Sequence, residues 1–371
     1  MRNLITGNEL CARAAIDAGC RFFAGYPITP ASAIFANLVR ELPRRGGVAM
    51  SSPDEISAIA YCIGASLRGI PSMTATSGPG WCLMSESVGY ALMAEVPVVI
   101  AVVQRLGPST GGATAGAQGD IGLVSEAVSG GYRFPIFSPS TAAECYTDTL
   151  RAFYWAERLR SPVVLLSDKE VASTAEVVDD EALPALVSPG RSEWRGGPVG
   201  YRTYAFEKEE DVPLFAPVGG SAKVTATGSA HDQAGLLRKN DPETLGVMRH
   251  LQAKIDAAEP ELGRVDFDYQ EGATTLVLSY GVSARASRDA VAQARSMGRR
   301  VSLGVLRTLF PLPVTALHAG LAGIERVVIP EENHGGLYRN AVLSALGKRE
   351  VVGVNRVGAL IRPEEILDAI I

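Results

Sequence analysis

In the first half of the chain, short apolar runs alternate with stretches that carry helical signals. The runs 97–103 and 162–166 contain no charged or hydroxyl side chain, a pattern typical of strands buried on both faces of a sheet. The other expected strands cover 21–25, 48–50 and 72–76, and the expected helices cover 8–19, 31–42, 54–67, 81–94 and 141–160. Strands that alternate with helices predict βαβ units and therefore a parallel sheet.

The remaining chain divides into two further zones. Residues 186–268 are rich in Pro, Gly, Ser and charge and show no strong period. Because such a stretch is too long for a bare loop inside a domain, we expect an extended connector that wraps its own or a partner's surface. Residues 269–371 resume the alternation, with strands expected at 274–279, 300–307, 326–329 and 351–354 and helices at 283–297, 314–321 and 335–346. The pattern therefore predicts an α/β fold with two doubly wound domains, 1–185 and 269–371.

Composition narrows the class of protein. The chain has 371 residues, 47% hydrophobic and 20% charged, so it can bury a core and is not a disordered chain. Its net charge of −5 gives no basic footprint for nucleic acid or an anionic membrane. The sequence contains no run of about 18 uncharged apolar residues, the length needed to span a bilayer. The N-terminus lacks an apolar signal core, so we expect a cytoplasmic protein.

The sequence is poor in metal ligands. Its 5 cysteines are widely spaced and form no C-x-x-C, and its 4 histidines are scattered. This argues against a disulfide framework and against an iron–sulfur cluster or zinc site held by this chain alone, so we expect no metal here. The pair His231-Asp232 favours a local turn because no third ligand lies near it in the sequence.

A glycine-containing turn, Ser77-Gly-Pro-Gly80, follows the expected strand 72–76. Its backbone N–H groups could bind an anion. It could equally be a tight turn that lets a helix approach the sheet, and the local sequence favours this second interpretation because no phosphate-binding lysine follows.

Two charged residues are candidates for chemistry. Glu55 lies beside Asp54 at the start of a helix of small and apolar residues. It could be a dipole partner of that helix, or a desolvated carboxylate with a raised pKa suited to proton exchange. Arg105 follows the buried strand 97–103, where ligands of open α/β sheets bind. Its guanidinium could hold a carboxylate, or it could cap helix carbonyls or pair with Asp120. Thr29, before Pro30, becomes a candidate only if its strand lies near that of Arg105.

Taken together, these segments resemble one family. The matching motifs occur in the order typical of the α subunits of 2-oxoacid:ferredoxin oxidoreductases, above all the 2-oxoglutarate type. In the first half of the chain they are Gly25-Tyr-Pro-Ile-Thr-Pro30, Asp54-Glu55, Thr74-Ala-Thr-Ser-Gly-Pro-Gly80, Gln104-Arg-Leu-Gly-Pro-Ser-Thr-Gly111 and Gln118-Gly-Asp120. Further along they are Thr227-Gly-Ser-Ala-His-Asp-Gln-Ala-Gly235, Ser279-Tyr-Gly281, Leu306-Arg-Thr-Leu-Phe-Pro311 and Val352-Gly-Val-Asn-Arg-Val-Gly358.

The resemblance implies a specific fold and site. The first domain would be the pyrimidine-binding domain of a thiamine diphosphate enzyme, and the second would resemble the C-terminal domain of transketolases. Glu55 would hydrogen-bond N1′ of the aminopyrimidine, a role that needs a carboxylate in an apolar pocket. Thr29, Arg105 and Thr114 would bind the 2-oxoacid. The remaining residues implied in cofactor binding are Pro27, Ile28, Ser77 and Gly78.

The resemblance also implies partners. In that family the diphosphate, Mg²⁺ and a [4Fe–4S] cluster belong to a β subunit, coenzyme A takes the acyl group and ferredoxin takes the electrons. We therefore expect an (αβ)₂ assembly whose active site lies at the α/β contact. On this resemblance we expect a chain without the third domain that some relatives carry.

Three departures from the family's pattern leave the choice of 2-oxoacid open. Ser52-Pro53 precedes Asp54-Glu55, Gly112-Ala-Thr-Ala115 lacks the usual proline and basic residue, and Trp81-Cys82 follows Gly80. A non-oxidative thiamine diphosphate decarboxylase or ligase subunit, and a catalytically inactive binding subunit, remain as alternatives.

Overall fold

The computed structural model describes residues 2–186 and 188–371. Its larger sheet has seven strands in the order β12-β6-β7-β5-β4-β2-β3, and all neighbours are parallel except β12 against β6. These strands are β2 (Phe22–Gly25), β3 (Val48–Ser51), β4 (Ser72–Thr76), β5 (Val98–Gln104), β6 (Ile136–Phe137), β7 (Pro162–Asp168) and β12 (Thr308–Phe310). The predicted parallel sheet is therefore confirmed.

Helices cover both faces of this sheet. They are α1 (Gly7–Asp17), α2 (Ser32–Glu41), α3 (Glu55–Leu67), α4 (Gly78–Met93), α5 (Ile121–Ser125), α6 (Ala142–Leu159) and α7 (Lys169–Ser173). Alternate residues of β5 enter opposite cores: Val99 and Ala101 pack with α1, α2 and α6, whereas Ile100 and Val102 pack with α3 and α4. This two-sided burial explains why the strand is an unbroken apolar run.

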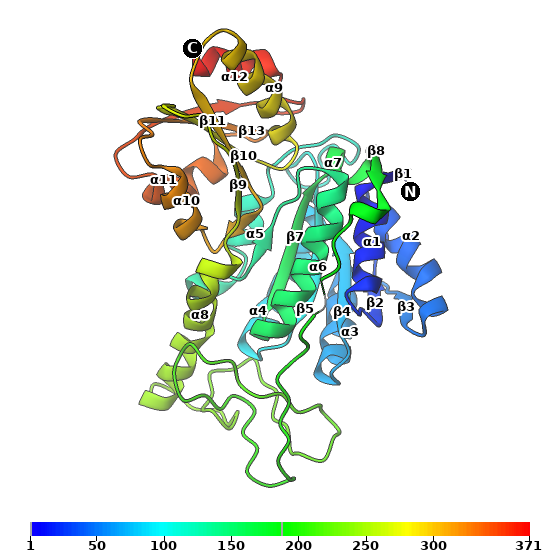
Figure 1. The fold of residues 1–371 in the computed structure, drawn as a ribbon. Helices are drawn as coiled ribbons and strands as arrows, with labels where there is room; N and C mark the ends of the chain where they lie inside the picture. The colour runs from blue at the N-terminus through cyan, green and yellow to red at the C-terminus, as the bar shows by residue number, and fades with distance from the viewer. Residues whose placement is uncertain (1, 187) are drawn as a thin grey trace.

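The second domain is a five-stranded sheet in the order β14-β13-β10-β11-β9, in which only β9 runs antiparallel. Its strands are β9 (Val265–Asp268), β10 (Thr275–Tyr280), β11 (Val301–Leu306), β13 (Arg326–Glu331) and β14 (Glu350–Asn355). Helices α9 (Ser283–Ser296) and α12 (Pro363–Ile370) cover one face. Helices α10 (Val314–Gly320) and α11 (Leu337–Leu346) cover the other, whose core is continuous with that of the first domain. Figure 1 shows the second domain beyond the upper end of the first sheet and the connector loops at the lower end.

The sequence pattern predicts an extended connector over 186–268, but the described part of this range is only partly extended. It contains the helix α8 (Pro242–Leu262), which begins after the N-cap Asp241, and it ends in β9 of the second sheet. The hydrophobic pattern does not predict α8 because its buried face includes the polar residues His250 and Lys254 beside Val247. A two-stranded antiparallel ribbon, β1 (Arg2–Thr6) with β8 (Ala175–Asp179), was also not expected.

Buried ionic contacts anchor α8 and the connector to the first domain. Glu95, at the end of α4, accepts hydrogen bonds from Lys254 Nζ at 2.5 Å and from His250 Nε2 at 3.2 Å. Burial opposes ionisation of Glu95, but the Lys254 ammonium and His250 hold the pKa of that carboxyl well below its usual range. Arg160 donates to the connector carbonyls of Thr203, Pro213 and Leu214.

Removing the cation of this cluster should destabilise the fold strongly. Lys254→Met leaves the Glu95 carboxylate buried without its main partner, which typically costs about 3–5 kcal/mol. We expect the free energy of unfolding, measured by urea titration of the chain, to fall by an amount in this range. Lys239→Met, at an exposed position, is the matched control. Equal stabilities for the two variants would contradict this account of how the connector is held.

Candidate active site

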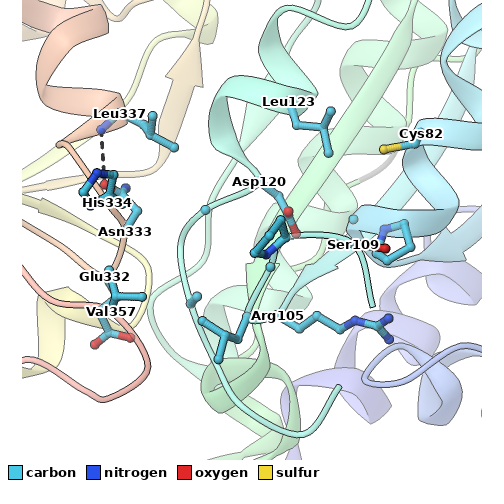
Figure 2. A pocket seen from close by; sticks show the side chains of 17 residues that line it. Cys82, Arg105, Ser109, Asp120, Leu123, Glu332, Asn333, His334, Leu337 and Val357 are labelled. Atoms are coloured by element: carbon cyan, nitrogen blue, oxygen red, sulfur yellow. Dashed lines mark hydrogen bonds between the residues drawn. The ribbon is translucent and has the colours of Figure 1, made fainter. Parts of the chain in front are cut away.

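The site lies where β4 and β5, which are neighbours in the sheet, reach their carboxyl ends. Ser77 and Gly78 follow β4 and begin α4, and Arg105 follows β5. A cleft of about 500 Å³ lies between this edge and the second domain. One wall comes from the first domain and carries Gly78, Pro79, Cys82, Arg105, Leu106, Gly107, Pro108, Ser109, Ala117, Gly119, Asp120 and Leu123. The other wall carries Glu332, Asn333, His334, Leu337 and Val357 (Figure 2).

Arg105 is positioned by the turn that follows β2. Its side chain extends away from the second-domain wall (Figure 2), and its Nη1 donates to the Thr29 carbonyl at 2.6 Å. The residue is only 6% exposed, and its Nε finds no partner among the described residues. The structure therefore brings Arg105 and Thr29 together. The contact uses the backbone carbonyl of Thr29, and Thr29 is an exposed residue. A buried guanidinium with an unused donor is well suited to a carboxylate or carbonyl oxygen.

Glu55 is the first residue of α3, after the N-cap Asp54, whose carboxylate accepts from Ser57 N. Glu55 itself is 4% exposed and lies against the first turn of α4, where a Cβ added to Gly80 would collide with its Oε1. Burial raises the pKa of Glu55, and the neighbouring Asp54 adds to the shift. The sequence left two interpretations of Glu55 open, a desolvated carboxylate and a partner of the helix dipole. The structure is compatible with both, because Glu55 is buried and lies at the N-terminus of α3.

Asp120 belongs to the site, although the sequence indicated it only within a motif and as an alternative partner of Arg105. It precedes α5, lines the cleft, and lies so close to Gly78 that a Cβ there would be 2.6 Å from its Oδ1. Burial raises the pKa of Asp120 to about 6, although Arg105 opposes the shift. Its Oδ2 finds no partner among the described residues, and neither does the Oγ of buried Ser77. The start of α4 is thus surrounded by buried polar atoms with unused bonding capacity.

Of the predicted site residues, Gly78 and Arg105 line the cleft and the other six do not, Glu55 and Thr29 among them. Ser77 is fully buried beneath Gly78, whereas Thr114 is exposed in the loop between β5 and α5. Pro27 is exposed and Ile28 half-buried in the turn that carries Thr29. Their predicted roles in binding stay predictions.

The described residues offer no group of three or more His, Cys, Asp and Glu side chains that could hold a metal ion. His231 is fully buried, with Nδ1 at 2.8 Å from the Asp232 carbonyl and its ring against Tyr204. Asp232 accepts from Ala234 N and Leu236 N, so this pair forms a turn in the described structure. Within the same described ranges, no helix combines the length and apolar character needed to cross a bilayer.

Two buried acids lie at the junction of the domains. Burial raises the pKa of Asp168 to about 7, despite hydrogen bonds donated by Val282 N and Gln118. Burial and the nearby Asp168 raise the pKa of Glu332 to about 8. Because the folded chain holds these protons more tightly than an unfolded chain with ordinary acids, their contribution to stability is present at low pH. It is lost as pH rises from about 4 through about 8.

Glu332→Gln should weaken this pH dependence. The amide stays neutral at every pH. Its oxygen can still accept the hydrogen bond that Ile361 N donates to Glu332 Oε1 at 3.1 Å in the parent chain. Between pH 6 and 9, we expect the melting temperature of the variant to fall less than that of the parent chain. Exposed Glu271→Gln serves as the control and should follow the parent. An identical fall in all three proteins would show that Glu332 is already ionised at pH 6.

Comparison with known proteins agrees with this geometry. Residues 13–236 match the thiamine-diphosphate-binding family "Pyruvate flavodoxin/ferredoxin oxidoreductase", and residues 273–366 match "Pyruvate:ferredoxin oxidoreductase core domain II". A split-gene transketolase shares the fold, with a TM-score of 0.57 at 14% identity. The family match and the shared fold thus define a protein with a thiamine-diphosphate-binding domain and a transketolase-like architecture.

Full-length relatives narrow the class. The chain is 38% identical to 2-oxoglutarate synthase subunit KorA of Methanothermobacter thermautotrophicus, over 99% of this chain and 97% of the relative. It is 31% identical to a ketoisovalerate oxidoreductase subunit VorB of the same organism, over 99% and 96%. The chain belongs to the α subunits of the 2-oxoacid:ferredoxin oxidoreductase family.

A solved relative shares the whole described architecture. The 2-oxoglutarate:ferredoxin oxidoreductase from Magnetococcus marinus, solved with 2-oxoglutarate, coenzyme A and succinyl-CoA bound, superposes with a TM-score of 0.91 at 30% identity. The match covers 99% of this chain but 64% of the Magnetococcus chain, so that relative carries additional sequence that this chain does not match.

Proposed function

We propose that this chain is the α subunit of a thiamine-diphosphate-dependent enzyme. In this proposal the enzyme oxidatively decarboxylates a 2-oxoacid, with 2-oxoglutarate the favoured substrate, to an acyl-CoA and passes the electrons to ferredoxin. The observation that carries the proposal is the buried Glu55, which forms no ion pair with any described residue and faces the glycine at position 80. A buried carboxylate without a cation is costly unless it has a task or a ligand.

The residues around Glu55 fit the aminopyrimidine end of the cofactor. A flat ring can approach the first turn of α4 because Gly80 carries no side chain there. The raised pKa of Glu55 lets its carboxyl share a proton with a ring nitrogen of similar basicity. When bound, thiamine diphosphate supplies the electron sink for decarboxylation. Pro27, Ile28, Ser77 and Gly78 remain the other predicted cofactor contacts of this chain.

Arg105 is suited to the acidic end of the substrate. Its unpartnered Nε lies beside the turn that carries Thr29, and its buried position excludes much of the water that would weaken an ion pair. Thr29 and Thr114 are exposed and would contact the 2-oxoacid from the rim once a partner subunit closes the site. Among the named relatives, four KorA subunits of 2-oxoglutarate synthases are 36–38% identical over nearly the full chain, which favours 2-oxoglutarate over a branched 2-oxoacid.

The proposal requires a β subunit. That partner would hold the diphosphate with Mg²⁺ and a [4Fe–4S] cluster, and two αβ units would form an (αβ)₂ assembly. The helices α3 and α4 pack side by side, and they expose the large apolar residues Ile56, Tyr61 and Leu83 at 52%, 42% and 50%. Large exposed apolar side chains on the helix that begins at Glu55 and on its neighbour are suited to a partner that completes the site.

Glu55→Gln tests the proposal in the assembled enzyme. The amide keeps the volume of the side chain but cannot share its proton, so we expect a fall in kcat of at least about a hundredfold. The measurement is 2-oxoacid- and coenzyme-A-dependent reduction of a low-potential dye by the co-purified complex. Exposed Glu325→Gln is the matched control and should keep the parent's rate.

Two outcomes would decide against the proposal. Full turnover of an assembled Glu55→Gln enzyme would remove the assigned role of Glu55. A parent complex that converts 2-oxoacids without reducing any dye would instead indicate a non-oxidative thiamine diphosphate enzyme.

A further inference from the structure

The loop between β5 and α5 carries Arg105 at its start and Asp120 at its end. Its backbone closes on itself through Leu106 N to the Ala115 carbonyl and Gly112 N to the Leu106 carbonyl, both at 2.8 Å. Residues 107–111 and Thr114, in the middle of the loop, are exposed. Such a loop needs a fixed point elsewhere if Arg105 and Asp120 are to keep their positions.

Gln118 is that fixed point, and its partners lie largely in the second domain. Its backbone N donates to the Glu332 carbonyl at 2.8 Å, and its carbonyl accepts from Asn333 Nδ2 at 3.0 Å. Its side-chain Oε1 accepts from Glu332 N at 3.0 Å and from Ser283 Oγ at 2.8 Å. Glu332 and Asn333 follow β13 and form part of the far wall of the cleft.

The amide nitrogen of the same side chain continues the network into the first domain. Gln118 Nε2 donates to Asp168 Oδ2 and to the Tyr280 carbonyl, both at 3.1 Å. The side chain is 0% exposed, and both donors and both acceptor positions are used. A buried polar network that is fully satisfied fixes one arrangement of its members, because any shift leaves a desolvated group unpaired.

From Asp168 the network leads back to the two ends of the loop. Asp168 Oδ1 accepts from Gln104 Nε2 at 2.9 Å, and Gln104 Oε1 accepts from Asp120 N at 3.1 Å. Gln104 immediately precedes Arg105. Hydrogen bonds therefore join the second domain to the backbone of Asp120 and to Gln104, the residue covalently bonded to Arg105.

We propose that Gln118 is a positioning residue, through which the second domain sets Arg105 and Asp120 at the substrate end of the cleft. The inference rests on the proposed function, because it assigns the consequence to 2-oxoacid binding. Gln118 touches neither the cleft nor the reacting groups; it acts through the backbone at 332–333 and through Asp168. The second domain, which supplies no predicted catalytic residue, thus sets the affinity for the 2-oxoacid.

Steady-state kinetics of the assembled enzyme test the proposal. Gln118→Ala removes all four side-chain hydrogen bonds, so the loop from Arg105 to Asp120 loses its side-chain anchor in the second domain. We expect KM for the 2-oxoacid to rise between about tenfold and about a hundredfold, while kcat and KM for coenzyme A change far less. Ser283→Ala removes a single bond and should raise the same KM less, which covers the case in which Gln118→Ala does not fold.

The control is Gln252→Ala, which removes a glutamine bonded to Arg133 N and Asp256 on another face. It should leave both KM values unchanged. If Gln118→Ala only reduces the amount of active enzyme, with KM for the 2-oxoacid unchanged, Gln118 is a purely structural residue and the proposal is wrong.

A parent complex without any 2-oxoacid activity would overturn the proposed function but not the positioning of the loop. Hydrogen exchange of the chain then measures the positioning directly. The proposal predicts faster exchange across 105–120 in Gln118→Ala than in Gln252→Ala, and equal exchange in the two variants would overturn it.

Discussion

The site depends on one constraint: the neighbouring parallel strands β4 and β5 are buried on both faces, and no side chain of either strand carries a charge before the carboxyl end. Residues 98–103 of β5 pack against helices on either side, and the carboxyl ends of β4 and β5 share an edge. Ser77, Gly78 and Arg105 reach the cleft region for this reason. The helix that starts at Glu55 packs against α4, so the same edge also brings a carboxylate to the first turn of α4.

The sequence was sufficient for elements whose stability is local. Strand β5 was predictable because each residue from Val98 to Val103 enters an apolar core, and α3 because Asp54 caps a helix of small residues. Elements stabilised by distant partners were not predictable. Helix α8 buries Lys254 against Glu95, 159 residues away in the chain, and β12 leaves the second domain to pair with β6 of the first sheet.

The same distinction applies to the site. Glu55 and Arg105 could be found because each stands at the end of a recognisable element and within a motif. The contact of Arg105 with the Thr29 carbonyl, the burial of Asp120 and the network around Gln118 depend on tertiary distances that no local pattern encodes. The scarcity of Cys and His is consistent with a chain that holds the organic end of a cofactor and relies on a partner for metal chemistry.

Reconstitution of the enzyme from separately purified subunits tests the central claim, that this chain supplies one half of a shared active site. The chain is mixed with its β subunit, thiamine diphosphate and Mg²⁺, and reduction of a low-potential dye is followed with 2-oxoglutarate and coenzyme A. The account predicts activity that requires both subunits and saturates as the β subunit is titrated in. Activity of either subunit alone, equal to that of the mixture, would contradict it.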